Sequence, residues 1–299
     1  MSALTPRLPP SGPVRLPGRG RTWVYDTGTP EADERLPPVV LLHGWTSSAA
    51  LNWYRCFEPL SARRRVVALD HRGHGRGIRS RKPFRLEDCA DDVAALIREL
   101  DLGPSVIAGY SMGGPVAQLV WKRHRSLVEG LVLCATAARF PVRPELGRVI
   151  GPFSFAVSVA LSGVPYELRR QGVSRLLRSR ASLSGSAAWA IEEWERNDPA
   201  ALIQAGLALG RFDSRAWLGE VDVPTAVIVT TMDTAVSPRR QAALAAAIPG
   251  AVAFEVAGSH RACVEEHRLF VPALLEACEI ASGRRPAEGE PVGSGGQLG

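Results

Sequence analysis

The chain has 299 residues, of which 45% are hydrophobic and 22% are charged, values typical of a globular protein with a substantial core. Its net charge of +6 is carried by arginine rather than lysine, since Lys82 and Lys122 are the only lysines. No basic run is interleaved with aromatic residues, so the composition gives no support for nucleic-acid binding.

The N-terminal segment and the cysteines both bear on location. Residues 1–20 are rich in proline, glycine and arginine and contain no apolar stretch of the kind found in a signal peptide. We predict a flexible arm there. The five cysteines are scattered and form no C-x-x-C pair, which argues against a disulfide framework or a zinc site. We therefore expect a cytoplasmic protein with reduced thiols.

Short apolar runs alternate with segments of helical spacing along most of the chain. After a first candidate strand, runs of strand length follow; the predicted strands are 21–26, 38–42, 65–69, 106–109, 130–134, 226–230 and 251–256. Helices are predicted at 86–100, directly after Ser111, at 238–247 and at 266–280. Fully apolar strands that alternate with helices predict an α/β fold with a mostly parallel sheet, covered on both faces.

This alternation stops between about residues 139 and 217, where no clear strand appears and Leu, Ala, Arg and Trp are frequent. We predict an inserted helical cap at 139–217, which divides the core into 21–138 and 218–282. Residues 283–299 are rich in Gly, Pro and Glu and are predicted to be a disordered tail.

The segment 109–113 reads Gly-Tyr-Ser-Met-Gly, with an apolar strand before it and a helical pattern after it. This G-x-S-x-G pattern predicts a sharp turn that exposes the hydroxyl of Ser111. Glycines on either side remove the Cβ atoms that would clash in so strained a turn. The backbone N–H of Met112 then lies at a helix N-terminus, where it can stabilise an oxyanion.

A serine hydroxyl becomes an effective nucleophile when a base takes its proton and a third group orients that base. Of the six histidines, His260 alone directly follows the final predicted strand, at the edge where α/β sheets place their sites. Asp233 follows the strand 226–230, whereas its main competitor Asp222 precedes that strand. We predict Ser111, His260 and Asp233 as nucleophile, base and orienting acid.

Three motifs carry a family resemblance: His43-Gly44-Trp45, Asp70-His71-Arg72-Gly73-His74-Gly75, and the glycine-flanked serine of 109–114. With the correctly ordered Asp233 and His260, they make the chain resemble α/β-hydrolase-fold serine hydrolases of the esterase and lipase branch. The resemblance implies a sheet of about eight strands and a second oxyanion-hole N–H from Trp45. It implies no metal and no organic cofactor. Ser111 stands where epoxide hydrolases and haloalkane dehalogenases of this fold have an aspartate, which argues against those activities.

Substrate contacts are expected from both the core and the cap. His43, Gly44 and Tyr110 adjoin the predicted oxyanion hole and nucleophile, and we expect them to border the substrate. Phe153 and Phe155 lie in an apolar stretch of the cap that suits an acyl or aromatic pocket. The tryptophans of this region, Trp189, Trp194 and Trp217, suit either the pocket or the packing of the cap onto the core.

The first half of the predicted cap is strongly basic. Between residues 139 and 180 arginines greatly outnumber the two glutamates, Glu145 and Glu167. Such charge is typical of a solvated helix face. Contact with an anionic membrane surface or an acyl-carrier partner is the less favoured alternative, and the sequence gives no oligomeric state.

Taken together, these patterns predict a serine hydrolase that cleaves carboxylic esters with an apolar acyl or alcohol part. Thioester hydrolysis, acyl transfer and cofactor-free haloperoxidase or perhydrolase activity require the same three residues and stay open as alternatives. A small-molecule receptor on this scaffold is the non-enzymatic alternative, although a receptor has no need of an activated serine.

Overall fold

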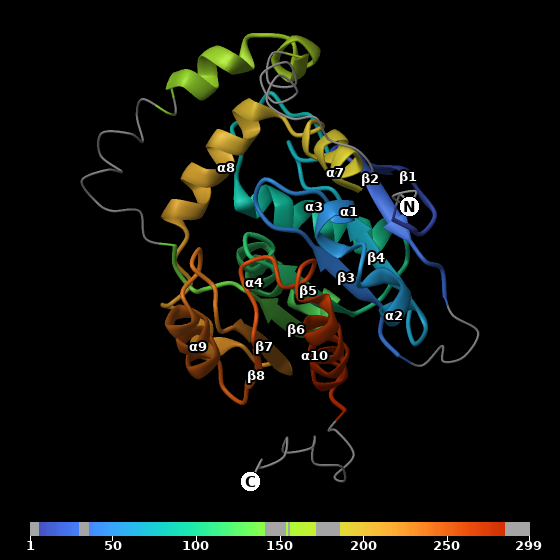
Figure 1. The fold of residues 1–299 in the computed structure, drawn as a ribbon, viewed down its shortest axis with the longest axis vertical. Coiled ribbons are helices and arrows are strands. Elements are labelled where there is room, and N and C mark those ends of the chain that lie inside the picture. Colours follow the sequence, from blue (N-terminus) through green and yellow to red (C-terminus); the bar gives the residue numbers. More distant parts are fainter. Residues whose placement is uncertain (1–5, 30–35, 141–153, 155, 172–185, 285–299) are drawn as a thin grey trace, which may run out of the picture.

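The computed structural model describes residues 6–29, 36–140, 154, 156–171 and 186–284. One sheet has the strand order β1-β2-β4-β3-β5-β6-β7-β8 (Figure 1). The strands are β1 (Ser11–Leu16), β2 (Gly20–Asp26), β3 (Val39–Leu42), β4 (Val66–Leu69), β5 (Ser105–Tyr110), β6 (Val128–Cys134), β7 (Thr225–Thr230) and β8 (Val252–Val256). From β4 to β8 in this order all neighbouring strands are parallel, while β1 and β2 add an antiparallel edge. This confirms the α/β-hydrolase fold class and the mostly parallel sheet that the sequence predicts.

The helices of the core are α1 (Ala49–Trp53), α2 (Phe57–Ser61), α3 (Leu86–Glu99), α4 (Gly113–Arg123), α9 (Pro238–Ala247) and α10 (His267–Ala281). Two short 3₁₀ helices, Arg125–Leu127 and Leu218–Glu220, precede β6 and β7. Pro272 lies inside α10 without ending it. Among the described residues, no helix combines the length and apolar character needed to cross a bilayer.

The core consists of two apolar layers, one on each face of the sheet. Along β3, Val40 and Leu42 point into the layer that contains α3, α4 and α9, whereas Val39 and Leu41 point into the layer that contains α1, α2 and α10. Successive side chains of a strand face opposite sides of the sheet. Strands buried on both sides therefore need the continuous apolar runs seen in the sequence.

The N-terminal segment corrects one expectation. Residues 11–16, predicted as part of a flexible arm, form β1 and pair with β2 from Ser11–Tyr25 to Leu16–Gly20. Without β1, the strand β2 would leave a row of unpaired backbone groups at the sheet edge. Leu16 is buried and packs in the layer of α3. Proline and glycine at 12–13 and 17–18 conceal this edge strand, because they weaken the strand pattern.

The described part of the predicted cap is helical. It comprises residues 156–162 and 166–171, then α7 (Ser186–Trp194) and α8 (Pro199–Arg211). Asp198 caps α8, its side chain accepting from the N–H of Ala200, and Pro199 occupies the first turn, a favourable helix start. Arg139 and Asp213 form an isolated antiparallel bridge, which brings the two ends of the insertion together. The tail predicted at 283–299 lies outside the described residues apart from its first two.

The turn after β4 holds the cap against the core. The carboxylate of Asp70 accepts the N–H groups of Ala49 (2.8 Å) and Arg76 (2.7 Å), and so fixes the turn. The carbonyl of Gly73 accepts the N–H of Asp198 at 2.9 Å, immediately before α8. Gly73 has φ +74°, and a Cβ there would lie 2.2 Å from the Cβ of Ala201 on α8. The glycine of this motif is therefore required for the approach of the cap.

Candidate active site

Ser111 occupies a strained turn between β5 and α4. Its φ is +51°, in the left-handed region that L-residues rarely adopt. The turn requires a glycine at position 109, because the start of the helix lies very close to it. A Cβ on Gly109 would be 2.2 Å from the carbonyl oxygen of Gly113. The N–H of Ser111 donates to Cys134 (2.9 Å), and the hydroxyl of Thr136 donates to the carbonyl of Ser111 (2.7 Å). These bonds hold the strained residue from the end of β6.

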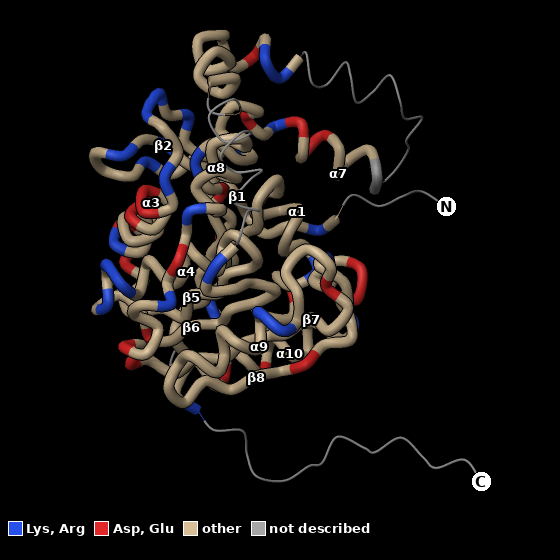
Figure 2. Tube along the Cα trace, turned by 90° about the vertical axis from the view of Figure 1, so that its left-hand side faces the viewer, with Lys and Arg blue, Asp and Glu red and all other residues tan. Residues whose placement is uncertain are grey.

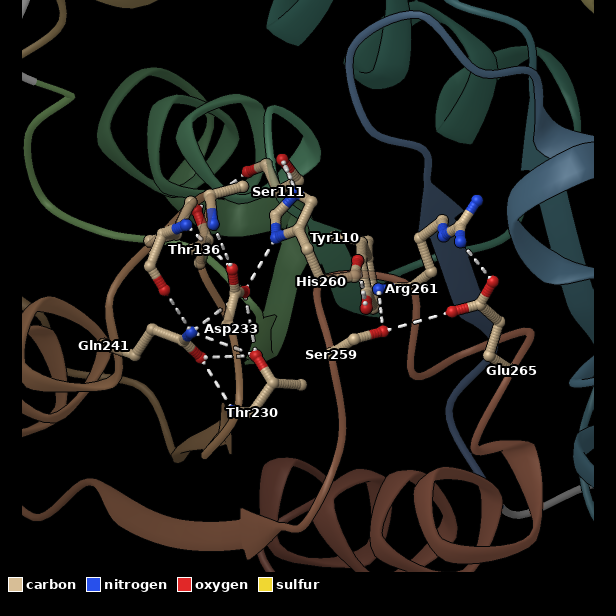
Figure 3. A network of polar contacts seen from close by, with 12 residues as sticks. Tyr110, Ser111, Thr136, Thr230, Asp233, Gln241, Ser259, His260, Arg261 and Glu265 are labelled. Carbon is tan, nitrogen blue, oxygen red and sulfur yellow. Dashed lines mark hydrogen bonds and ion pairs between the residues drawn. The ribbon is translucent and has the colours of Figure 1, made fainter.

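The structure brings the three predicted residues together at the carboxyl edge of the sheet, beyond β5, β7 and β8 (Figure 3). The Nε2 of His260 lies 3.0 Å from the Oγ of Ser111, and its Nδ1 lies 2.7 Å from the Oδ2 of Asp233. A carboxylate can only accept, so Nδ1 carries the ring hydrogen of a neutral His260 and Nε2 presents its lone pair to the serine hydroxyl. This tautomer is the one a base for Ser111 requires.

Asp233 is held as an ionised carboxylate. Its Oδ1 accepts the backbone N–H groups of Ala235 and Val236, both at 2.8 Å. Its Oδ2 also accepts from the hydroxyl of Thr230 at 3.0 Å and from the amide of Gln241 at 3.1 Å. Burial alone would raise the pKa of Asp233. The hydrogen bonds, first that from His260, outweigh burial and hold this pKa below its ordinary value.

Two backbone N–H groups, those of Trp45 and Met112, lie close to Ser111. Gly44 approaches the serine so closely that a Cβ on it would be 3.2 Å from the Cβ of Ser111, which brings the loop 43–45 against the nucleophile. Met112 caps α4, where helix N–H groups have no intrahelical acceptor. Within the described chain, the N–H groups of Trp45 and Met112 donate to no protein atom. Donors in this position suit an oxyanion.

His43 supports this loop rather than bordering a substrate, which corrects the sequence expectation. Its side chain is fully buried. Its Nδ1 donates to the carbonyl of Gly44 at 2.8 Å, and its Nε2 accepts the N–H of His71 at 3.0 Å. Burial lowers the pKa of His43 to about 4, so it is a neutral group that joins the loop after β3 to the turn after β4.

Tyr110 is a second correction. Its side chain is 3% exposed, and its hydroxyl donates to the carbonyl of His260 at 3.0 Å. The ring lies beneath the loop of His260 and packs edge-on against Trp53 and Phe270. Tyr110 therefore positions His260 and does not face a substrate. The side-chain direction could not be read from the sequence, because it depends on which face of β5 the residue occupies.

The cap contacts Trp45, which remains 43% exposed. The indole Nε1 of Trp45 donates to the carbonyl of Leu202 at 2.8 Å, and its ring lies against Gly206, where a Cβ would be 2.8 Å from the ring. A cavity of about 450 Å³ adjoins this contact, lined by Trp45, Phe140, Ile203, Leu207, Ala235 and Arg240 among others. Phe153 and Phe155, the predicted pocket residues of the cap, lie outside the described residues.

The tryptophans of the insertion show packing contacts. Trp189 packs edge-on against Tyr54, with ring centroids 5.5 Å apart, and Trp217 stacks on Trp121 at 6.0 Å. Neither lies among the described residues that line the cavity beside Trp45. For these two tryptophans the structure favours packing of the insertion onto the core over the pocket interpretation.

Four supporting residues were not predicted. Thr136 and Asn52 hold the backbone on either side of the nucleophile, Asn52 by accepting the N–H of Gly44 at 2.9 Å. Thr230 and Gln241 hold Asp233, and Gln241 also bonds the backbone of Thr230 and Val236. These four residues belong to no local pattern, because each reaches the site from a different element of the fold. Among the described residues, no group of His, Cys, Asp and Glu side chains could hold a metal ion.

The strand order of the sheet and the arrangement of Ser111, His260 and Asp233 at its carboxyl edge are features that proteins of one family share. The sequence profile of the alpha/beta hydrolase fold matches residues 37–266, and the chain belongs to this family of hydrolases.

Relatives in the family differ in the reaction their names describe. The chain is 29% identical over 258 residues to a putative carbamate hydrolase, RutD, of Agrobacterium fabrum. This alignment covers 82% of this chain and 94% of that protein. It is also 29% identical over 246 residues to a pimeloyl-(acyl-carrier protein) methyl ester esterase of Chromobacterium violaceum. That alignment covers 81% of this chain and 94% of the esterase. The structure of a thermophilic esterase from Thermogutta terrifontis superposes with a TM-score of 0.66 at 26% identity. The superposition covers 89% of this chain and 96% of that chain.

Proposed function

We propose that this protein is a serine hydrolase that cleaves carboxylic esters with an apolar acyl or alcohol part. The observation that carries the proposal is the hydrogen-bonded chain from Ser111 through His260 to Asp233, with distances of 3.0 and 2.7 Å. A hydroxyl, a correctly oriented imidazole and a buried carboxylate in this order are the parts required to activate a serine. The names of the esterase relatives agree with this class of substrate.

The proposed reaction has two halves. Ser111 attacks the ester carbonyl while His260 takes its proton at Nε2, and the oxygen charge of the tetrahedral intermediate is stabilised by the N–H groups of Trp45 and Met112. His260 then gives the proton to the departing alcohol. In the second half, water attacks the acyl-enzyme, again with His260 as base, and the acid is released. Asp233 keeps its charge throughout and stabilises the imidazolium.

The cavity beside Trp45 supports an apolar substrate group. Its volume of about 450 Å³ lies within the range of small-molecule sites. Most of the named lining side chains are apolar, and Arg240 is the charged one among the described lining residues. Trp45 and Ala235 place this cavity next to the proposed oxyanion donor and the loop of Asp233. An acyl or alcohol chain of modest length fits these surroundings.

Hydrolysis of a series of p-nitrophenyl esters, from acetate to palmitate, tests the proposal together with labelling by a fluorophosphonate. We expect turnover, a preferred chain length and covalent labelling of Ser111. Wild-type protein that neither hydrolyses any of these esters nor becomes labelled would overturn the proposal in favour of a receptor. Product analysis in the presence of an added alcohol or thiol distinguishes hydrolysis from acyl transfer.

Replacement of Asp233 by asparagine is expected to lower kcat by about 10³- to 10⁴-fold. An asparagine has one acceptor oxygen, whereas Asp233 accepts from His260 on one side and from two backbone N–H groups on the other. If the asparagine oxygen accepts these backbone N–H groups, its NH₂ group faces Nδ1 of His260. The ring hydrogen of His260 then lies on Nε2, and this tautomer cannot act as a base toward Ser111. Steady-state kinetics check this, with Asp222→Asn, which precedes β7, as control. Equal kinetics for Asp233→Asn and wild type would contradict the assigned role.

A further inference from the structure

A second cavity, of about 630 Å³, lies between the loop after the Gly73 turn and the cap. It is separated from the proposed ester site by α8. Ala201 and Gln204 of α8 line this cavity, whereas Leu202 and Gly206 contact Trp45 on the other side of the helix. None of its described lining residues also lines the cavity beside Trp45. The cavity is therefore a separate space with chemistry of its own.

The lining is strongly cationic. Its described charged residues are Arg72, Arg79, Arg81, Lys82, Arg169 and Asp198. Two of the five cations are neutralised: Arg72 bonds Asp92 with two nitrogens, at 2.8 and 2.7 Å, and Arg169 pairs with Asp198 at 2.8 Å. The other three, Arg79, Arg81 and Lys82, form no ion pair with any carboxylate of the described chain. Within the described chain, the cavity thus presents three uncompensated positive charges. Figure 2 shows where basic residues lie along the chain trace.

Arg79 is fixed before any ligand arrives. Its guanidinium donates to the carbonyls of Gly77 (3.1 Å) and Arg196 (2.7 Å) and to the hydroxyl of Tyr166 (3.1 Å). All these acceptors are neutral, so they orient the guanidinium without cancelling its charge. The group also lies over the ring of Tyr166, 4.4 Å from its centroid. An oriented guanidinium in a partly enclosed site is well suited to bind an oxyanion.

Arg81 and Lys82 are exposed, as Arg79 is, but unlike Arg79 they have no side-chain bond that fixes them among the described residues. Long cationic side chains at the mouth of a cavity can close over a bound anion. Phe84, Pro165 and Val164 supply apolar surface beside the charges. The lining therefore combines a polyanion subsite with a surface for an organic group.

We infer that this cavity binds a small organic phosphate, a molecule that carries two or three negative charges and an apolar or aromatic part. Three cations that have no ion pair among the described residues match that charge, and guanidinium groups match the geometry of phosphate oxygens. The volume suits a small molecule rather than a bare ion. This proposal does not depend on the proposed ester hydrolysis, because Ser111, His260 and Asp233 are not among the described residues that line this cavity.

Pyridoxal 5′-phosphate is a direct probe, because its phosphate can occupy an anion site while its aldehyde forms an imine with a nearby lysine. Borohydride reduction followed by peptide mapping gives the modified residue. The chain offers an internal control: Lys122, its only other lysine, is paired with Glu220 at 2.6 Å outside the cavity. We expect labelling of Lys82 to exceed that of Lys122 by about tenfold and to be suppressed by pyrophosphate. Equal labelling of both lysines without protection would overturn the inference.

Calorimetric titration with pyrophosphate provides a second measurement. The double variant Arg81→Gln/Lys82→Gln is expected to bind about tenfold or more weakly than wild type. The matched control Arg15→Gln/Arg21→Gln removes the same charge from the exposed edge of β1 and β2, and we expect it to bind like wild type. Equal weakening in both variants, or no saturable binding to wild type, overturns the inference. If the protein binds phosphatidylglycerol vesicles but not pyrophosphate, the inference is overturned in favour of contact with a membrane surface.

Discussion

Alanine at Ser111, alanine at His260 and both changes together are each expected to lower kcat for ester hydrolysis by nearly the same factor, about 10⁵ or more. The two side chains act as one unit, since the imidazole has nothing to activate once the hydroxyl is gone. The residual rate then depends on substrate binding and on the N–H groups of Trp45 and Met112, which neither change removes. Steady-state and burst kinetics on the preferred p-nitrophenyl ester measure the effect.

Two controls match the chemistry of these changes. Ser259 is next to His260 in the chain, but its hydroxyl bonds Glu265 and Glu266 rather than Ser111 or Asp233 (Figure 3). His267 begins α10, away from the serine. Ser259→Ala and His267→Ala should both stay close to wild-type activity. Losses that multiply in the Ser111/His260 double variant would show that the two residues act independently and would contradict the proposed mechanism.

A large loss of stability is expected when the pH falls from 7 to 5, because three buried histidines are held neutral. His43, His71 and His74 are at most 1% exposed, and their rings lie close together, with His43 4.4 Å from His71 and 5.4 Å from His74. Burial lowers the pKa of His43 to about 4 and that of His74 to about 3. Burial, followed by the charges of its neighbours, also lowers the pKa of His71 well below its ordinary value.

The sign of the effect follows from proton uptake. Below the ordinary histidine pKa of 6.5, the unfolded chain binds protons that the folded chain excludes, so acid favours unfolding. The contribution of the three neutral histidines to the free energy of unfolding is fully present above this pH and falls progressively toward pH 4. At pH 5 each histidine costs about 2 kcal/mol, or about 6 kcal/mol for the three, a large part of the typical stability of a domain. The lowered pKa of Asp233 adds a further loss only at more acidic pH.

Urea unfolding at pH 7.5, 6 and 5 measures this dependence. The variant His71→Leu supplies a sharp comparison, because neither ring nitrogen of His71 has a hydrogen-bond partner in the described structure. We expect it to remove about one third of the slope between pH 6 and 5. His267→Gln, a change outside the cluster, should leave the slope intact. A free energy of unfolding that is constant from pH 7.5 to 5 would show that these histidines are not held neutral.

The order of elements and the class of fold were predictable from local pattern. Apolar runs such as Val39–Leu42 predict buried strands because both of their faces are covered, and the glycines around Ser111 predict a turn that other residues cannot form. The helix Pro238–Ala247 was predicted with the bounds observed, since a proline begins it. By contrast, β1 escaped prediction because it is a short edge strand among prolines and glycines.

Local pattern was enough to predict Ser111, Asp233 and His260 at three strand ends, because the carboxyl ends of parallel strands lie at one edge of a sheet. The roles of the residues around them depend on how the chain folds. The fold turned Tyr110 and His43 inward as supports, brought Gln241 and Thr230 to Asp233, and placed Arg79, Arg81 and Lys82 around one cavity. These outcomes depend on contacts between residues far apart in the chain, and no local pattern encodes such contacts.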